Sequence, residues 1–382
     1  YDNIQYINLL TKFYQKTKND YYKKKLIQTI SFINKEFKNN ENLYGSAYDA
    51  DSEGIEGKYY VWPYDELKKI LENDFGLFEK KYEISNKGNF EGNNILIESK
   101  NQLNKEEQNK IAEIEEKLIQ KRKKRVKPFF DDKSQTDLNA FILNSLIGSS
   151  IVLEDNNLMD ETINTLEILN DKLSNKIYHC YDSSEIDAFL EDYVYYAMLL
   201  VTLYEVDGNE SSLAKAINIM KEIWELFYNN KTQLLQKNKI KDNDLFVSPI
   251  DLNDSNIPNG NSVYLNLCNK IYTITNDKFW FDKMEILKKS FHQVLNSFFS
   301  QMFSFIKTLD LCENSISFTF FGNKDSVKDI KVNLHKNYLG RATFVYKNND
   351  ENEGSVVICK NQTCSEKLKD LSEVKKYLEN RI

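Results

Sequence analysis

Strongly apolar segments alternate along the chain with amphipathic ones, and a short polar turn joins each pair. The clearest pair runs over 188–206, turns at 207–209 and continues to 227. Its first segment is apolar on nearly all sides, which is typical of a buried helix. The second carries apolar residues on one face and charges on the other, which is typical of a surface helix lying over the first. We expect further pairs over 4–37, 138–169 and 263–298.

Repeated pairs of inner and outer helices predict a mostly α fold, an α/α toroid. Residues 43–62 mix glycine, acids and β-formers, so we expect a β-hairpin inserted at the mouth of the ring. Segments 315–321, 341–346 and 355–359 alternate like strands around a helix at 325–334, which predicts a small α+β element. We therefore expect a toroid domain over 1–310 and a C-terminal α+β element over 311–382 packed on it.

Composition narrows the classes of partner. The net charge of −7 and the pI near 5.4 argue against nucleic acid and anionic membranes as partners. The longest apolar runs are far too short to span a bilayer. Five cysteines without a C-x-x-C motif exclude a disulfide-rich scaffold. Reduced thiols and a cytoplasmic location are the expectation. Only 4 prolines and 12 glycines favour long helices over many short strands.

Acidic residues beside the inner helices are the candidates for chemistry. Glu191 and Asp192 lie in an otherwise apolar helix, where an unpaired carboxylate costs several kcal/mol. They are either pocket acids or first-turn acids favoured by the helix dipole. Asp131 and Asp132 precede the helix that contains Leu138, and are either capping residues, with Ser134 as a possible cap, or pocket acids.

The amino ends of inner helices converge at one end of a toroid, so these clusters are expected to meet there. The predicted catalytic acids are Asp51, Asp132 and Asp192. The predicted ligand contacts are Asp49, Glu53, Trp62, Asn139, Glu191, Tyr193, Asn259, Asn261 and Ser262. The segment 259–262 is also a tight turn with a helix N-cap, which is a sufficient structural reason for it.

No cofactor or metal is predicted. The 49–53 cluster lacks the glycine and the later glutamate of an EF-hand loop. Cys359 and Cys364 have no further zinc ligands nearby in the sequence. The three histidines, His179, His292 and His335, show no metal spacing and are interpreted as incidental.

Several stretches, in this order, resemble the C-terminal part of a family of thioredoxin-domain proteins, the family of spermatogenesis-associated protein 20. They are the stretches 1–3, 44–54, 56–62, 88–96, 127–133, 189–193 and 258–263, together with Cys359 and Cys364. The most specific is 49–62, which contains Asp-Ala-Asp-Ser-Glu-Gly and ends in Tyr-Tyr-Val-Trp.

The resemblance implies a toroid of the six-hairpin glycosidase type, similar to sugar epimerases and glycoside hydrolases. It also implies an N-terminal thioredoxin-like domain that this chain lacks. The first helices of the toroid are expected to be missing from this chain as well. The active-site histidines of the epimerases have no evident counterpart here, which disfavours a histidine-dependent epimerase. The family pattern has tryptophan at the position of Leu138 and serine at that of Asn259.

Two hypotheses of different class follow. In the first, the toroid binds or acts on a carbohydrate-like small molecule, as a glycosidase or sugar isomerase would. Its acids then work as general acid and base, with Tyr193 and Trp62 stacking on a sugar ring. In the second, it is a non-catalytic scaffold that presents a client to the missing thioredoxin-like domain, and the acids are architectural.

Overall fold

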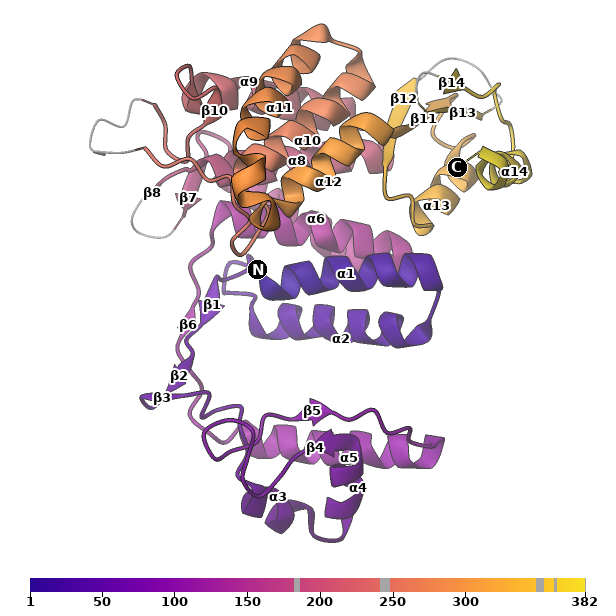
Figure 1. Cartoon of the computed structure of the whole chain (residues 1–382). Helices are drawn as coiled ribbons and strands as arrows, with labels where there is room; N and C mark the ends of the chain where they lie inside the picture. The colour runs from indigo at the N-terminus through magenta and orange to yellow at the C-terminus, as the bar shows by residue number, and fades with distance from the viewer. Residues whose placement is uncertain (182–185, 241–247, 348–353, 361–362, 382) are drawn as a thin grey trace. The chain divides into compact units, whose positions relative to one another are not determined.

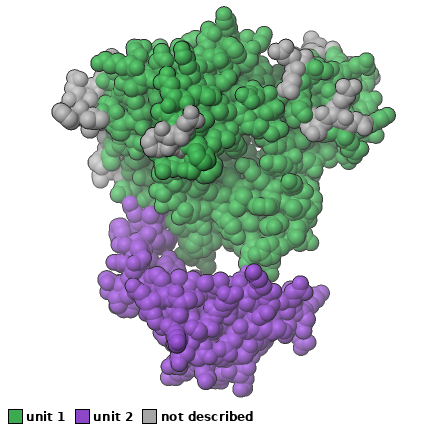
Figure 2. Space-filling view, viewed as in Figure 1, with its two compact units in different colours: residues 1–46, 133–382 green, residues 47–132 purple. Residues whose placement is uncertain are grey.

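The computed structural model describes residues 1–381 except 182–185, 241–247, 348–353 and 361–362. The chain forms two compact units, and Figure 2 shows them in different colours. The larger comprises residues 1–46 and 133–382 and is the toroid unit. The smaller comprises residues 47–132 and is called the inserted unit below.

The toroid unit is built from paired helices, as the hydrophobic pattern predicts (Figure 1). The four pairs are α1 (Asp2–Thr17) with α2 (Asp20–Glu36), α6 (Thr136–Leu153) with α7 (Asn156–Lys172), α8 (Leu190–Asp207) with α9 (Glu210–Phe227), and α10 (Gly260–Thr275) with α11 (Lys278–Phe298). A short 3₁₀ turn, η2 (Phe299–Gln301), leads into α12 (Phe303–Asn314). The inner helices contact one another in the order α1, α6, α8, α10, α12. Inner and outer helices alternate along the chain, which confirms the α/α toroid.

Burial separates the inner from the outer helices. Inner α8 buries residues on every side, whereas α9 buries one stripe that contains Ala216, Met220 and Ile223 against it. Helix α6 is long and apolar enough, by length and composition, to cross a membrane, contrary to our expectation from the sequence. In the structure 67% of that stretch is buried inside the protein, because it is a central helix of the core.

Short β-ladders connect the pairs. One joins β7 (Tyr178–Cys180) to β8 (Ile186–Asp187) ahead of α8, and another joins β9 (Tyr228–Asn229) to β10 (Leu234–Leu235) after α9. Helix starts carry side-chain caps: Asn209 accepts a hydrogen bond from the Ser212 N–H at 3.1 Å, and Asn259 accepts one from the Ser262 N–H at 2.9 Å. The N-cap predicted within 259–262 is therefore confirmed, and Asn259 is the capping residue. Helix α6 instead begins after Gln135 without a side-chain cap, so the capping role considered for Asp131, Asp132 and Ser134 is wrong.

The C-terminal element is a small sheet with helices, as predicted. Its strand order is β12 (Ala342–Lys347), β11 (Ile316–Phe321), β13 (Ser355–Lys360), β14 (Thr363–Cys364), with β11 and β12 parallel and the other pairs antiparallel. Helices α13 (Lys328–Lys336) and α14 (Leu371–Arg381) complete it, and its apolar core extends to Tyr204 and Leu213 of the helical body. Cys359 and Cys364 form a disulfide between β13 and β14, which corrects the expectation of reduced thiols for this pair.

Gly208 is the residue that allows α8 to end against this sheet. It has φ +69°, and a Cβ atom placed on it would lie 2.9 Å from the Tyr346 ring. We expect Gly208→Ala to lower the free energy of unfolding by about 2 kcal/mol. Alanine would have to adopt the left-handed conformation, and its Cβ would clash with the Tyr346 ring. Gly54→Ala is the control, since Gly54 has φ +74° with open space around its Cβ position. Urea unfolding that gives equal losses for both variants would contradict the packing argument.

The inserted unit is larger than the hairpin that the sequence predicts. The hairpin is present as β2 (Asp51–Ser52) and β3 (Ile55–Glu56), and β1 (Ala47–Tyr48) pairs with β6 (Phe130–Asp131) where the chain enters and leaves the unit. Between them lie further elements: α3 (Tyr64–Leu71), η1 (Glu72–Asp74), α4 (Phe75–Lys81), β4 (Tyr82–Glu83), β5 (Ile97–Glu98) and α5 (Lys105–Arg122). The unit has an apolar core of its own, which includes Trp62, Phe78 and Ile114.

Candidate functional site

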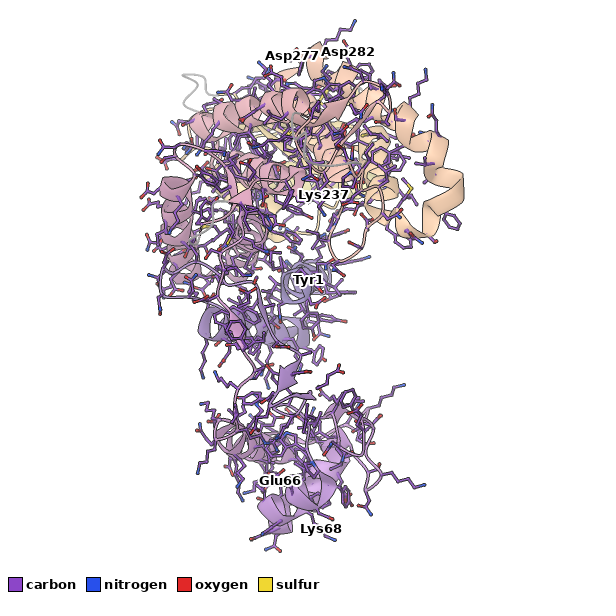
Figure 3. The ribbon with its side chains drawn as sticks, turned by 90° about the vertical axis from the view of Figure 1, so that its left-hand side faces the viewer. Tyr1, Glu66, Lys68, Lys237, Asp277 and Asp282 are labelled. Carbon is purple, nitrogen blue, oxygen red and sulfur yellow. A yellow bond between two sulfur atoms is a disulfide. The ribbon has the colours of Figure 1, made fainter. Side chains whose placement is uncertain are left out.

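A pocket of about 510 Å³ lies in the toroid unit, lined by the amino ends of α6, α8 and α10 and by the segment 251–259. This volume is in the range of small-molecule sites. Figure 3 labels two of the lining residues, Tyr1 and Lys237. The side chains that line it are mostly polar: Gln135, Asp137, His179, Glu191, Lys237, Asp251, Asn253, Ser255, Asn256 and Asn259, with Phe189, Leu138, Ile257, Pro258 and Tyr1.

Asp192 lies behind the pocket and is fully buried. It is in the first turn of α8, where its Oδ2 accepts a hydrogen bond from the Phe189 N–H at 2.8 Å and caps the helix. Its Oδ1 accepts a hydrogen bond from the Asp137 N–H, at the start of α6, at 3.1 Å. One carboxylate therefore ties together the amino ends of two neighbouring inner helices.

His179 connects this carboxylate to the pocket. Its Nδ1 lies 3.0 Å from both oxygens of Asp192, and its Nε2 lies 3.3 Å from the Gln135 amide nitrogen. Burial lowers the pKa of His179. The hydrogen bond to Asp192 and the charges of Asp192 and Asp137 outweigh burial, so the pKa of His179 is raised overall. The imidazole thus keeps a proton on Nδ1, facing Asp192, and turns its other nitrogen toward Gln135.

Asp137 is the second carboxyl of the cluster, and it faces the pocket. Burial, followed by the negative charge of Asp192, raises the pKa of Asp137 from 3.8 to about 6. Its Oδ1 accepts a hydrogen bond from the Leu138 N–H at 2.7 Å, which favours the charged form without cancelling these effects. This carboxyl is thus half protonated near pH 6 and mostly ionised at neutral pH.

The raised pKa of Asp137 predicts a pH-dependent change in stability. Because the folded pKa of about 6 exceeds the unfolded 3.8, the fold binds the proton more tightly, and stability is lost as pH rises from about 4 to 6. Asp137→Asn removes that loss and keeps an acceptor for the Leu138 N–H. We expect the free energy of unfolding of the variant to exceed that of the native chain by about 1–3 kcal/mol at pH 7 and to equal it at pH 4.

Urea unfolding at a series of pH values measures this difference. Asp282→Asn is the matched control, because Asp282 is an exposed residue on α11, well separated from Lys237 in Figure 3. If the free energies of unfolding of Asp137→Asn and the native chain differ by the same amount at pH 4 and at pH 7, the raised pKa of Asp137 is contradicted.

Glu191 is the third acid of the site. Burial raises the pKa of Glu191, and among the residues that the structure describes its Oε2 atom is buried without a hydrogen-bond partner. A Cβ atom at Gly260, the first residue of α10, would lie 3.0 Å from the Glu191 Oε1 and 2.8 Å from Leu190. Glycine at position 260 therefore allows α10 to approach closely enough to enclose this carboxyl.

The cluster is a hydrogen-bonded group rather than a ready metal centre. One ligand-type atom each from Asp137, His179 and Asp192 lies within 4.8 Å of the others. Both oxygens of Asp192, however, already accept hydrogen bonds from two backbone N–H groups and from the His179 ring. A cation would have to displace the proton on His179 Nδ1, and the donors around Asp192 would still point at it.

The structure places the predicted residues of the toroid unit in three settings. Glu191 and Asn259 line the pocket, and Asp192 supports it from behind. Tyr193 is buried in α8, with its hydroxyl 3.4 Å from Glu222. Asn139 and Asn261 are fully buried and bond to the backbone of Tyr44 and Leu235 respectively. Ser262 is buried and lines a different cavity, described below.

The other predicted residues belong to the inserted unit. Asp49, Asp51 and Asp132 are exposed, and the Asp51 N–H donates to the Asp49 Oδ1 at 3.1 Å. Glu53 pairs with Lys58 at 2.8 Å. Trp62 is 2% exposed, and the Arg125 guanidinium lies 4.0 Å from its ring centroid. Of the three predicted catalytic acids, only Asp192 belongs to the toroid unit.

Sequence reasoning missed Asp137 and His179. Asp137 is adjacent to Leu138, where an acid at a helix start has an ordinary explanation in the helix dipole. His179 lies in β7, and its contact with Asp192 depends on the pairing of β7 with β8, which no helical spacing reveals. The only signal available was the presence of a histidine a short distance before an acidic pair at a helix start.

These features define a class of protein: an α/α toroid with an acid-lined pocket at the amino ends of its inner helices. The chain is homologous to spermatogenesis-associated protein 20, which confirms the family resemblance. It is 22% identical to the mouse protein over 99% of its own length and 57% of the relative, and 21% identical to an uncharacterised protein of Caenorhabditis elegans over 98% and 60%. The chain thus spans little more than half the length of these relatives. No family model matches the chain.

Solved structures with related helix arrangements are more distant. An α-mannanase of glycoside hydrolase family 76 from Bacteroides thetaiotaomicron is 12% identical, with a TM-score of 0.45, over 87% of this chain and 72% of that one. A D-mannose isomerase is 13% identical, with a TM-score of 0.39, over 75% of this chain and 73% of that one.

Proposed function

We propose that the pocket binds a neutral, polyhydroxylated small molecule of the sugar type and exchanges protons with it, with Glu191 and Asp137 as the acid–base pair. The observation that carries this proposal is the Glu191 carboxyl, which lines the pocket with one buried oxygen unpartnered among the described residues. A polar atom in that position costs stability unless a ligand or water satisfies it.

The two carboxyls differ in their surroundings, which favours different roles. Burial is the largest influence on the pKa of Glu191 and raises it, which favours the protonated form and suits this side chain to donate a proton. Asp137, with a pKa of about 6, is mostly ionised at neutral pH and is suited to accept one. Asp192 and His179 act as positioning residues, because Asp192 fixes both the start of α6 and the orientation of the imidazole.

The rest of the lining supports a neutral ligand with many hydroxyls. Asp137, Glu191 and Asp251 disfavour an anion, and the ammonium group of Lys237 is already engaged by Asp251 at 3.3 Å. Gln135, Asn253, Ser255 and Asn256 offer amide and hydroxyl groups that both donate and accept hydrogen bonds. Phe189, half-buried and edge-on to His179 at 4.9 Å between ring centroids, adds an apolar surface on which a sugar face can rest.

A ligand-observed NMR screen tests the proposal. Saturation transfer from the protein to a panel of neutral mono- and disaccharides is expected for the native chain and for the control Asp282→Asn. The same spectra, followed over hours, report hydrolysis or isomerisation of the bound sugar. The signal is expected to fall at least tenfold in the double variant Asp137→Asn, Glu191→Gln. Absence of binding by every sugar in the panel would overturn the proposal, and binding without turnover would leave the pocket as a recognition site only.

A further inference from the structure

A second cavity, of about 500 Å³, lies among the inner helices and has a chemistry opposite to that of the acidic pocket. Its lining comes mainly from α1, α6, α8, α10 and α12, with Gly340 and Ala342 from the C-terminal element. Of the described residues it shares only Pro258 with the acidic pocket. Among the residues that the structure describes, three lysines line it, one each from α1, α10 and α12, and no aspartate or glutamate does. The lysines are Lys12, Lys270 and Lys307. This concentration of positive charge stands out in a chain with a net charge of −7.

Two of these lysines have no acidic partner among the described residues. Lys270 pairs with Glu205, but Lys12 and Lys307 approach each other closely enough for their amino groups to interact. The charge of Lys12, followed by burial and the charge of Lys270, lowers the pKa of Lys307 to about 8. Lys12 and Lys307 are both exposed, so solvent screens part of the repulsion between their ammonium groups, and an anion bound between them would relieve the rest.

Unsatisfied polar groups line the same cavity. The Asn144 Oδ1, the Asn266 Oδ1 and the Ser262 Oγ are buried without a hydrogen-bond partner among the described residues. The serine hydroxyl and the amide groups can donate to oxyanion oxygens, while the amide oxygens can accept from hydroxyls of the same ligand. Asn144 lies on α6, and Ser262 and Asn266 lie on α10. These three residues therefore line the same cavity as the lysines.

We infer that this cavity is a binding site for an oxyanion, and specifically for the phosphate group of a small phosphorylated, hydroxylated molecule, with Lys12 and Lys307 as the paired cationic contacts. A phosphate offers enough acceptor oxygens to engage both ammonium groups and the Ser262 hydroxyl together. The inference does not rest on the proposed function of the acidic pocket, because the two cavities use different residues.

Isothermal titration calorimetry tests the site with inorganic phosphate, a hexose monophosphate and the uncharged hexose as probes. The native chain is expected to bind the two phosphates at one site and to bind the hexose monophosphate more tightly. Lys307→Met and Lys12→Met should each weaken phosphate binding at least tenfold. Lys278→Met, which removes an exposed lysine at the start of α11, should leave it unchanged.

A thermal readout separates loss of the site from loss of the fold. Lys307→Met is expected to melt at a higher temperature than the native chain without phosphate, because the repulsion between lysines is gone. Added phosphate should raise the melting temperature of the native chain and leave that of Lys307→Met unchanged. Asp137→Asn and Glu191→Gln should retain phosphate binding, which distinguishes failure of this site from failure of the acidic one. No phosphate binding, or binding that is equal in the native chain and Lys307→Met, would overturn the inference.

Discussion

Replacing Asp192 with alanine is expected to lower the free energy of unfolding by about 3 kcal/mol, the largest loss that we predict for a single side chain of this protein. Asp192 is fully buried and accepts hydrogen bonds from the Phe189 N–H, the Asp137 N–H and the His179 ring. Its removal takes the acceptor from three partly buried donors and releases the amino ends of α6 and α8 from each other.

Urea unfolding and a histidine pKa measured by NMR check this prediction together. Glu210→Ala is the matched control, because Glu210 is an exposed acid in the first turn of α9 and should cost about 0.5 kcal/mol or less. In Asp192→Ala the pKa of His179 should fall, since Asp192 is the main group that raises it. A loss below 1 kcal/mol with an unchanged histidine pKa would show that Asp192 does not hold the cluster together.

Glu191→Gln is expected to retain the fold and to slow the turnover of any sugar substrate by about 10²–10⁴-fold, the usual contribution of a general acid. Glutamine preserves the size of the side chain and its place beside Gly260, but it cannot donate a proton in the way a neutral carboxyl can. Because burial raises the pKa of Glu191, the loss of a charge is not expected to destabilise the fold.

Two measurements define the outcome for Glu191→Gln. The sugar that the native chain converts should be converted more slowly, while its affinity changes by less than tenfold. Glu222→Gln is the control: Glu222 lies on outer helix α9 and contacts the hydroxyl of Tyr193, which does not line the pocket. Native turnover in Glu191→Gln would exclude Glu191 as the acid and transfer the role to Asp137.

The helical body could be predicted because its pattern is local. Apolar residues recur at helical spacing in α8 and along one face of α9, and polar turns separate them, so inner and outer helices can be told apart. The cap at Asn259 follows from the same local logic. The inserted unit could not be recognised in the same way. Its apolar core combines α5 with α3 and α4, and helices of 8 and 7 residues are too short to be told from other short apolar runs by periodicity alone.

The site residues, too, could be predicted only where their significance is visible in the local sequence. Glu191 and Asp192 could be identified because carboxylates in an apolar helix require an explanation wherever the helix packs. Asp137 and His179 acquire their significance only from tertiary contacts, through the approach of α6 to α8 and the pairing of β7 with β8. The cationic cavity was not predicted either, because Lys12, Lys270 and Lys307 are far apart in the sequence and each looks like an ordinary surface lysine.

A crystal structure determined from crystals soaked with the best-binding neutral sugar tests most directly whether the acidic pocket is a sugar site. We predict that the sugar occupies the pocket at the amino ends of α6, α8 and α10, with a hydroxyl within hydrogen-bonding distance of the Glu191 Oε2 and another near the Asp137 carboxyl. A sugar bound elsewhere on the chain, with water or protein side chains filling this pocket, would contradict the account.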